Sequence, residues 1–311
     1  MKILQEYNNG NVNVKIYEDG TLEREYPDDQ EPMPEFPSSI DVKITNYCYP
    51  TEDNPICSYC HEKSNTKGKH SNIDKLLNTL SVLPAGVEIA IGGGAAQSHP
   101  DFKHFLSTIR KQGLIPNLTI NEKHLKDSFN DLSSYINKDI FGIGISYSDK
   151  RYFEDIKKYI ELSDNIVFHI IMGINKLSDI DDLLELCNSY GKKCKVLILG
   201  YKQFGWGINY YVKNKSVEGN KYSWYTQLPR YFNKENLVLS FDNLAINQLN
   251  LKRFFFEESW NQFFMGEDFT HTMYIDAVNE QYAPTSTSDY STRKSFDDSS
   301  LIDYFKTYRN K

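Results

Sequence analysis

The chain has 311 residues, of which 40% are hydrophobic and 25% are charged, and its formal net charge is −7 at neutral pH. This composition is typical of a globular protein, and the absence of a long unbroken apolar run argues against a membrane-spanning one. The acidic balance also argues against extensive nucleic-acid binding, because a phosphate-binding surface needs a broad excess of Lys and Arg.

The first twenty residues and the use of cysteine both favour a cytoplasmic protein. Charged and amide residues interrupt the N-terminal segment every few positions, so it does not resemble a secretory signal peptide. The chain has five Cys, an odd number, and three of them crowd into positions 48–60. Such a cluster suits a metal site in a reducing compartment better than a disulfide framework.

Residues 1–37 are expected to form a hairpin followed by a linker. Alternating residues in 12–17 and 21–23 flank the turn sequence Asp19-Gly20, a pattern that predicts a β-hairpin. Four prolines then fall between Pro27 and Pro37, and they exclude regular structure because proline lacks the backbone donor.

Residues 38–205 alternate between short apolar runs and stretches of helical periodicity, which predicts βαβ units around a parallel sheet. Helices are expected near 73–83, 101–112, 122–136, 151–162 and 179–190. The expected strands are Asp41–Thr45, Val87–Ile91, Asn117–Asn121, Ile140–Ser146, Ile166–Met172 and Lys195–Leu199.

This pattern suits either a doubly wound open sheet or a partial barrel, and the pattern alone does not separate them. In both architectures ligands bind at the carboxyl ends of the strands. We therefore look for chemistry in the residues that follow each expected strand.

Residues 206–311 are expected to form an α+β extension that covers the substrate side. Strands are expected at 237–241 and near 273–276, with a helix near 257–264. A Ser- and Thr-rich stretch at 283–293 predicts a loop or lid, and the run Gln203-Phe204-Gly205-Trp206-Gly207 suggests a flexible loop that closes over a ligand.

Cys48, Cys57 and Cys60 occupy the loop after the first strand of the alternating region. Thiolates are the preferred ligands of iron–sulfur clusters, and three of them on one loop hold a cubane while its fourth iron stays open. The alternative is a zinc-stabilised binding module in which His61 or His70 supplies the fourth ligand that structural zinc normally takes.

Two further features accompany the cysteines. Tyr59 directly precedes the third Cys, and Gly92-Gly93-Gly94 directly follows the second expected strand. With these features the sequence resembles the radical S-adenosylmethionine (radical SAM) superfamily over residues 38–205. The family's usual triple is Cys-x3-Cys-x2-Cys, whereas the first gap here is eight residues.

The resemblance implies a set of site residues. The thiolates of Cys48, Cys57 and Cys60 would ligate one [4Fe–4S] cluster, and its open iron would chelate S-adenosylmethionine. Residues expected to contact S-adenosylmethionine are Tyr59 and Tyr201 near adenine, Gly92, Gly93 and Gly94 near the methionine moiety, and Asn121 and Ser146 near ribose and carboxylate. Without the cysteines, the glycines would also suit a phosphate-bearing ligand, although they lack Gly-x-Gly-x-x-Gly spacing.

The resemblance also implies a fold and an activity. The fold would be a partial (β/α)6 TIM-like barrel. The enzyme would reductively cleave S-adenosylmethionine to a 5′-deoxyadenosyl radical that abstracts hydrogen from a substrate. An external one-electron donor of the flavodoxin or ferredoxin type is implied as a partner. The sequence leaves the substrate open among a small molecule, a nucleoside and a peptide.

Overall fold

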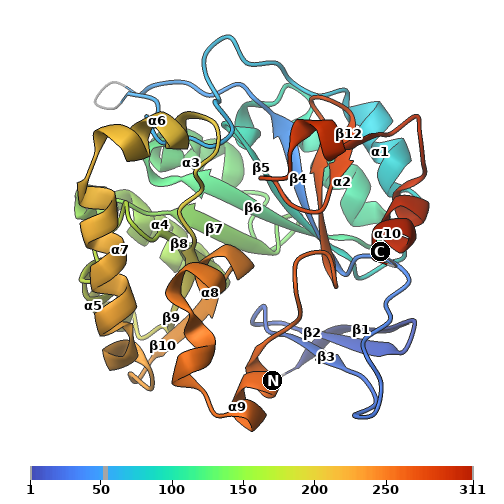
Figure 1. Ribbon diagram of the computed structural model, residues 1–311. Helices are drawn as coiled ribbons and strands as arrows, with labels where there is room; N and C mark the ends of the chain where they lie inside the picture. Colours follow the sequence, from blue (N-terminus) through green and yellow to red (C-terminus); the bar gives the residue numbers. More distant parts are fainter. Residues whose placement is uncertain (1, 52–54, 310–311) are drawn as a thin grey trace.

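The computed structural model describes residues 2–51 and 55–309 and contains two β-sheets. A three-stranded antiparallel sheet has the order β1-β2-β3. A ten-stranded sheet has the order β10-β9-β8-β7-β6-β5-β4-β11-β12-β13. Figure 1 shows the small sheet below the large one.

The strands are β1 (Ile3–Asn9), β2 (Val12–Tyr17), β3 (Leu22–Glu25), β4 (Ser39–Thr45), β5 (Glu88–Gly93), β6 (Ile115–Asn121), β7 (Gly142–Ser146), β8 (Ile166–Ile171), β9 (Cys194–Leu199), β10 (Leu237–Phe241), β11 (Thr272–Asp276), β12 (Gln281–Ala283) and β13 (Lys294–Ser295). The α-helices are α1 (Ile73–Leu80), α2 (Phe102–Lys111), α3 (Leu125–Leu132), α4 (Phe153–Leu162), α5 (Asp179–Ser189), α6 (Trp206–Lys213), α7 (Ser216–Gln227), α8 (Asn243–Leu249), α9 (Glu257–Phe263) and α10 (Leu301–Arg309).

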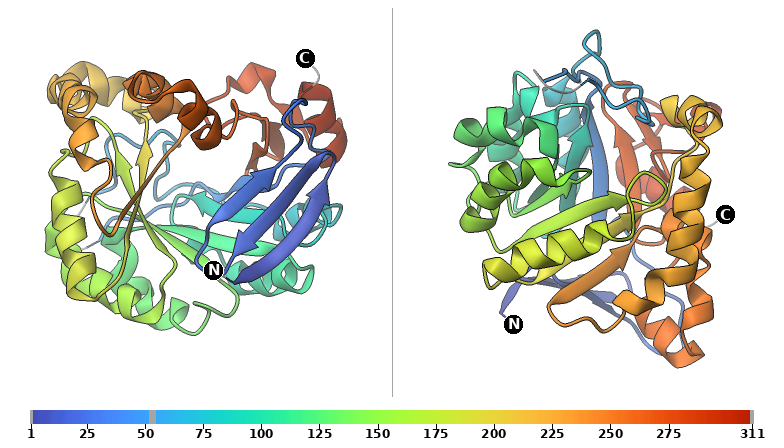
Figure 2. Two further views of the ribbon diagram at one scale, coloured as in Figure 1. Left: turned by 90° about the horizontal axis from the view of Figure 1, so that it is seen from below. Right: turned by 90° about the vertical axis from the view of Figure 1, so that its left-hand side faces the viewer.

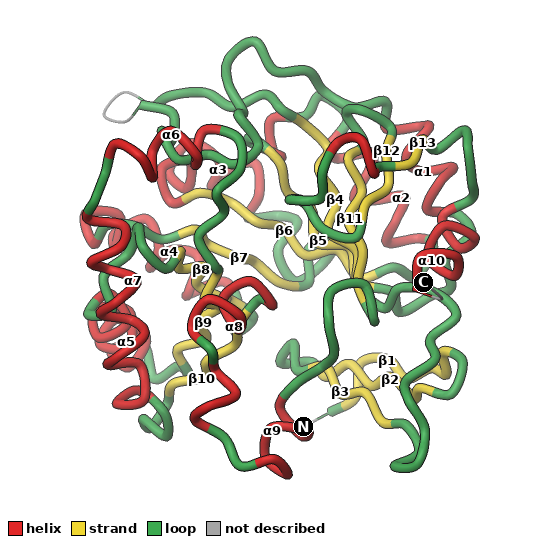
Figure 3. The backbone as a smooth tube through the Cα atoms, viewed as in Figure 1, coloured by secondary structure: helices red, strands yellow, loops and turns green. Residues whose placement is uncertain are grey.

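The prediction of an α/β fold with a large, mostly parallel sheet is confirmed. Strands β4 to β9 are the six expected from the sequence, and each pairs in parallel with the next. A helix follows each of the first five, and α1 to α5 lie along the outer side of the sheet (Figure 2). Because parallel strands point the same way, the loops after them gather at one edge, at the top of Figure 3.

The two faces of this sheet differ in chemistry. On β4, Ile40, Val42 and Ile44 are fully buried and belong to the main hydrophobic cluster with the helices. The alternate positions Asp41 and Lys43 lie on the opposite face, because successive strand residues point to opposite sides. The inner face is therefore polar where the outer face is apolar.

The N-terminal residues form more than the predicted hairpin. Strands β2 and β3 pair around the Asp19-Gly20 turn as expected, and β1 adds a third strand to β2. Val12, Val14 and Ile16 of this sheet are buried against Ile115, at the start of β6. The small sheet therefore covers the amino end of part of the large sheet.

Four strands from residues 206–311 join the large sheet, and two of them, β10 and β11, pair directly with the six expected strands. Strand β10 pairs in parallel with β9, and β11 pairs in parallel with β4 on the other side. Both strands were expected, but their insertion into the main sheet was not. The large sheet thus extends beyond the six expected strands, and the partial (β/α)6 barrel and the domain boundaries after residues 37 and 205 stay predictions.

A search of residues 2–51 and 55–309 finds no helix with the length and apolar character needed to cross a bilayer.

Candidate functional site

Three cysteine side chains line one cavity at the carboxyl edge of the parallel sheet. Their loop follows β4, and the opposite wall comes from the ends of β5, β6 and β7. The cavity brings together most of the predicted site residues, namely Cys48, Cys57, Cys60, Gly92, Gly93, Gly94, Asn121 and Ser146. These residues lie up to 98 positions apart in the sequence, and they meet because parallel strands end at the same edge.

Backbone hydrogen bonds fix both ends of the cysteine loop. The Cys48 amide donates to the Asn65 carbonyl at 3.0 Å, and the Trp206 amide donates to the Cys60 carbonyl at 3.0 Å. Residues 52–54, which belong to the predicted motif loop, lie outside the described residues. The ligand-bearing positions on either side of them are thus anchored to the rest of the fold.

Gly92 and Gly93, which the sequence placed after the second strand, are the last two residues of β5, and Gly94 follows it. The three glycines are required for different structural reasons. A Cβ atom on Gly94 would lie 2.0 Å from the Tyr47 carbonyl oxygen, and one on Gly93 would lie 2.3 Å from the Thr45 carbonyl oxygen. A Cβ atom on Gly92 would meet nothing within 4 Å. Gly93 and Gly94 therefore let two backbone segments approach, whereas Gly92 leaves space open in the cavity.

The cysteine thiols influence one another electrostatically. Burial, together with smaller contributions from the neighbouring Cys57 and Cys60, raises the pKa of Cys48 to about 11. Burial also raises the pKa of Cys60, although backbone amides of Ser64 and Glu62 oppose this effect. The three thiols thus lie within electrostatic range of one another on the wall of one cavity.

Two donors from the end of β6 approach the sulfur of Cys57. The Asn121 side-chain amide lies 3.9 Å from Cys57 Sγ, and the Lys123 ammonium lies 3.7 Å from it. Asn121 was predicted as a site residue, whereas Lys123 was not. The sequence feature that could have identified Lys123 is its position directly after an expected strand, where α/β folds place ligand-binding residues.

Glu122, between these two donors, is another residue that sequence reasoning missed. Its side chain is buried, and one carboxylate oxygen accepts a hydrogen bond from Ser148 at 2.5 Å. The other oxygen has no hydrogen-bond partner in the described structure. Burial raises the pKa of Glu122 to about 7.

The two predicted tyrosines lie outside the lining of this cavity. The Tyr59 hydroxyl hydrogen-bonds to Cys57, and its ring meets Tyr210 edge-on with centroids 5.6 Å apart. The Tyr201 hydroxyl instead donates to the Gly207 carbonyl at 2.8 Å, and both backbone groups of Tyr201 bond to the Gln248 side chain. Tyr59 thus supports the cysteine loop, and the backbone of Tyr201 is already engaged.

The two histidines considered as zinc ligands point elsewhere. His61 Nε2 lies 3.5 Å from a Glu62 carboxylate oxygen, and His70 Nδ1 hydrogen-bonds to Thr45 Oγ1 at 2.9 Å. Neither is among the residues that line the cysteine cavity. Within the described ranges, no three His, Cys, Asp or Glu side chains are grouped as a preformed site for a single metal ion.

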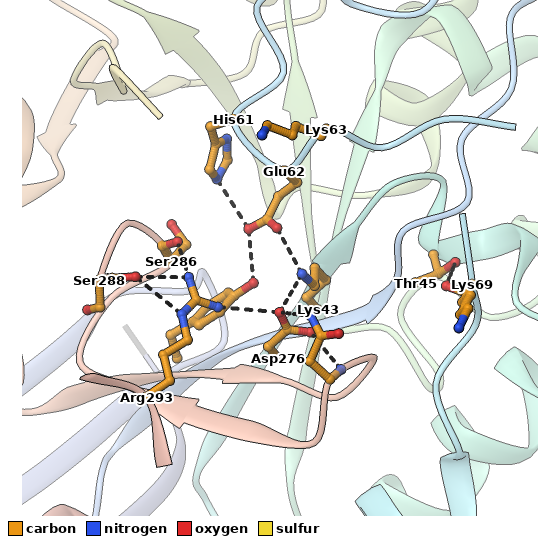
Figure 4. A network of polar contacts seen from close by, with 12 residues as sticks. Lys43, Thr45, His61, Glu62, Lys63, Lys69, Asp276, Ser286, Ser288 and Arg293 are labelled. Carbon is orange, nitrogen blue, oxygen red and sulfur yellow. Dashed lines mark hydrogen bonds and ion pairs between the residues drawn. The ribbon is translucent and has the colours of Figure 1, made fainter. Parts of the chain in front are cut away.

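A buried network of charges holds the end of the cysteine loop on the sheet (Figure 4). Lys43 on β4 lies 2.5 Å from Asp276 on β11 and 3.0 Å from Glu62, which follows Cys60 by two positions. Arg293 also contacts Asp276, at 3.3 Å, and the Tyr274 hydroxyl donates to Glu62 at 2.9 Å. The charges of the two cations and the two carboxylates cancel, and buried charges need such pairing.

The glycine-containing segment after β9 packs against the cysteine loop. A Cβ atom on Gly205 would lie 2.1 Å from the His61 carbonyl oxygen, so this contact requires glycine. Trp206 lines a shallow outer groove with Pro50, Pro55 and Ile56. The hypothesis that this segment closes over a ligand is therefore not supported, because its backbone instead braces the cysteine loop.

These features define an α/β protein with a parallel sheet, a polar inner face and a three-cysteine cavity at the carboxyl edge of its strands.

Solved structures with a similar fold include three of Streptococcus suis SuiB, a radical SAM enzyme. SuiB bound to the precursor peptide SuiA has a TM-score of 0.58 and 12% identity, over 88% of this chain and 65% of that chain. SuiB bound to S-adenosylmethionine has a TM-score of 0.56 and 12% identity, over 88% and 66%. SuiB alone has a TM-score of 0.56 and 14% identity, over the same shares.

At these identities the likeness shows a shared fold. The present chain spans slightly less than two thirds of the SuiB chain. No family model matches the sequence, and no curated protein matches it. The expected radical SAM resemblance is thus supported at the level of the fold.

Proposed function

We propose that this protein is a radical SAM enzyme that holds one [4Fe–4S] cluster on Cys48, Cys57 and Cys60. The observation that carries the proposal is that these thiols share one cavity with the glycines at the end of β5. When bound, the cluster supplies an electron that cleaves S-adenosylmethionine into methionine and a 5′-deoxyadenosyl radical, which abstracts hydrogen from substrate.

The donor set fits a cluster better than a zinc ion. Each thiolate of a three-cysteine site meets a different iron at a separate corner of the cubane. A tetrahedral zinc ion instead needs four ligands around one point, with thiolate sulfurs about 3.8 Å apart at ordinary Zn–S lengths. The cavity offers three cysteines, and the candidate fourth ligands His61 and His70 lie outside it.

The cavity walls have distinct tasks in this proposal. Gly92 leaves room for the methionine moiety of S-adenosylmethionine, since nothing lies within 4 Å of where its side chain would stand. Asn121 and Ser146 offer hydrogen bonds from the neighbouring strand ends. Lys123 places a positive charge beside Cys57, with its ammonium nitrogen 3.7 Å from the Cys57 sulfur.

The substrate and the partners are further parts of the proposal. The SuiB structure that contains a precursor peptide favours a peptide substrate over a small molecule or nucleoside. An external one-electron donor of the flavodoxin or ferredoxin type would reduce the cluster.

The test is iron and sulfide analysis of anaerobically reconstituted protein, with an absorption spectrum. We expect about four irons and four sulfides per chain in the wild type. Cys57→Ala should lose the cluster, whereas Cys187→Ala should retain it because Cys187 is buried in the hydrophobic core away from the cavity. One zinc per chain without iron would overturn the proposal and favour the zinc-stabilised module.

A further inference from the structure

A second cavity opens on the inner face of the sheet, between β4 and β11 on one side and β10 and α8 on the other. Its volume is about 280 Å³. Ser39 and Asp41 of β4, Lys202, Asp242 and the 284–287 segment contribute to its lining. It shares no lining residue with the cysteine cavity.

Asp41 is the unusual residue of this chamber. It lies in the middle of β4, a strand that pairs on both sides, with Ala90 of β5 and Tyr274 of β11 as its neighbours. Its side chain is nevertheless exposed, because it faces the chamber. In the described part of the chain, no hydrogen bond or ion pair engages its carboxylate.

The cations around Asp41 make their hydrogen bonds and ion pairs with other residues. Lys43, two positions along the same strand, lies between Glu62 and Asp276. Arg24 donates to the Ser38 hydroxyl at 2.9 Å, and Lys202 donates to the Ser286 hydroxyl at 2.9 Å.

The charged lining of the chamber is predominantly acidic. It carries four carboxylates, from Asp41, Asp242, Glu267 and Asp268, against the two cations Arg24 and Lys202. The remaining titratable group, His271, is neutral at pH 7 because burial lowers its pKa to about 3. Although the Asp41 side chain faces the open chamber, the surrounding chain partly desolvates it and raises its pKa, the nearby Lys202 opposes this shift, and a bound cation would lower the pKa.

We propose that this chamber binds a cationic group of the substrate, a primary ammonium or guanidinium, and that Asp41 is the residue that recognises it. A carboxylate that faces a chamber and makes no hydrogen bond there favours a cation, with which it can form a charge-assisted hydrogen bond. Only the identification of the bound group as part of a substrate rests on the proposed radical SAM function.

The position of Asp41 also sets the length of the substrate. Asp41 precedes Thr45 by four positions, and Thr45 pairs with Gly93 at the edge of the cysteine cavity. At about 3.3 Å per residue the anchor lies roughly 13 Å below that edge. A substrate that spans both cavities would be elongated, with its cation at one end, as in a peptide that carries a basic side chain or a free amino terminus.

Methionine residues in the chamber allow a direct binding test. Met265 and Met273 line it, whereas Met33 is exposed and Met172 belongs to the hydrophobic core. We would label the full chain with methyl-¹³C methionine and titrate it with n-butylammonium, n-butanol and n-butyrate. The Met265 and Met273 signals should shift saturably with n-butylammonium alone, and those of Met33 and Met172 should stay fixed.

Isosteric variants test the role of Asp41. Asp41→Asn should weaken n-butylammonium binding at least tenfold, whereas the exposed control Glu257→Gln should leave it unchanged. Lys202→Met should leave the affinity unchanged or raise it, because it removes a competing cation. Circular dichroism and a thermal midpoint within a few degrees of wild type would show that each variant is folded.

Three results would overturn the inference. These are binding of n-butyrate that depends on Lys202, equal n-butylammonium affinity in Asp41→Asn, and no shift with any probe. The titration needs neither cluster nor S-adenosylmethionine. A chain that binds n-butylammonium but holds no iron would thus retain the chamber and overturn only the proposed function.

Discussion

The same strands form two faces of the sheet that differ in burial and in polarity. The outer face of β4 and β5 presents Ile40, Val42, Ile89 and Ile91, which are at most 1% exposed and pack against helices. The inner face presents charged, amide and glycine positions that line two cavities. Because successive residues of a strand point to opposite faces, the same strand supplies residues that stabilise the fold on one face and residues available for binding on the other.

The inner face itself contains both paired and free charges. The largest loss of folding stability is expected where one member of a buried ion pair is removed. Asp276→Asn would leave Lys43 and Arg293 without their shared carboxylate, and the free energy of unfolding should fall by about 3 to 5 kcal/mol. Urea denaturation measures it.

The matched control for this variant is Asp297→Asn. Asp297 makes an exposed ion pair with Lys75, so its removal should cost less than about 1 kcal/mol. Equal losses in the two variants would contradict the structural role assigned to the buried network.

On the outer face, Ile89→Ala should lower the free energy of unfolding by about 3 kcal/mol, because it opens a cavity in a closed core. Cluster content per folded chain should stay at the wild-type value, since the side chain points away from the site. Calorimetry and iron analysis of the same preparation provide both readouts. Loss of iron from fully folded protein would show that the two faces are not separable.

The raised pKa of Glu122 predicts that the stability of the cluster-free protein depends on pH. Its pKa is raised by burial from 4.5 to about 7, so the folded chain holds a proton that the unfolded chain has released between these values. Stability should therefore fall as pH rises from 4.5 to 7, by about 3 kcal/mol from this group. In Glu122→Gln this part of the decline should disappear from urea denaturation curves at pH 5 and pH 8. An unchanged pH profile would refute the assignment.

A substitution in the glycine run is expected to have the smallest effect on stability, and it should specifically weaken S-adenosylmethionine binding. Gly92→Ala should change the free energy of unfolding by less than about 1 kcal/mol, because its Cβ enters open space, yet it should weaken S-adenosylmethionine binding at least tenfold. Gly94→Ala should destabilise the fold, because its Cβ would overlap the Tyr47 carbonyl. Equilibrium dialysis and thermal unfolding separate the two effects. Tight binding by Gly92→Ala would remove Gly92 from the cofactor site.

The sequence predicted those features that depend on local pattern. Strands β4 to β9 follow from apolar runs between helical stretches, and the meeting of Cys48 with Asn121 and Ser146 follows from the shared edge of parallel strands.

Other features depend on contacts that no local pattern encodes. Lys43 and Asp276 are 233 positions apart and pair only because β11 inserts beside β4. The bonding of Gln248 to the backbone of Tyr201 is a similar long-range contact. The flexible-loop hypothesis for Gly205 stays a prediction for a related reason, because a glycine required for close packing and a glycine required for motion look alike in a sequence.

The most direct test of the central claim is the formation of 5′-deoxyadenosine by the reduced protein. Anaerobically reconstituted wild type, supplied with dithionite and S-adenosylmethionine, should release 5′-deoxyadenosine and methionine in equal amounts, and Cys57→Ala should release neither. A brown, iron-loaded wild-type protein that binds S-adenosylmethionine and leaves it intact under reduction, with and without candidate basic peptides, would contradict the account.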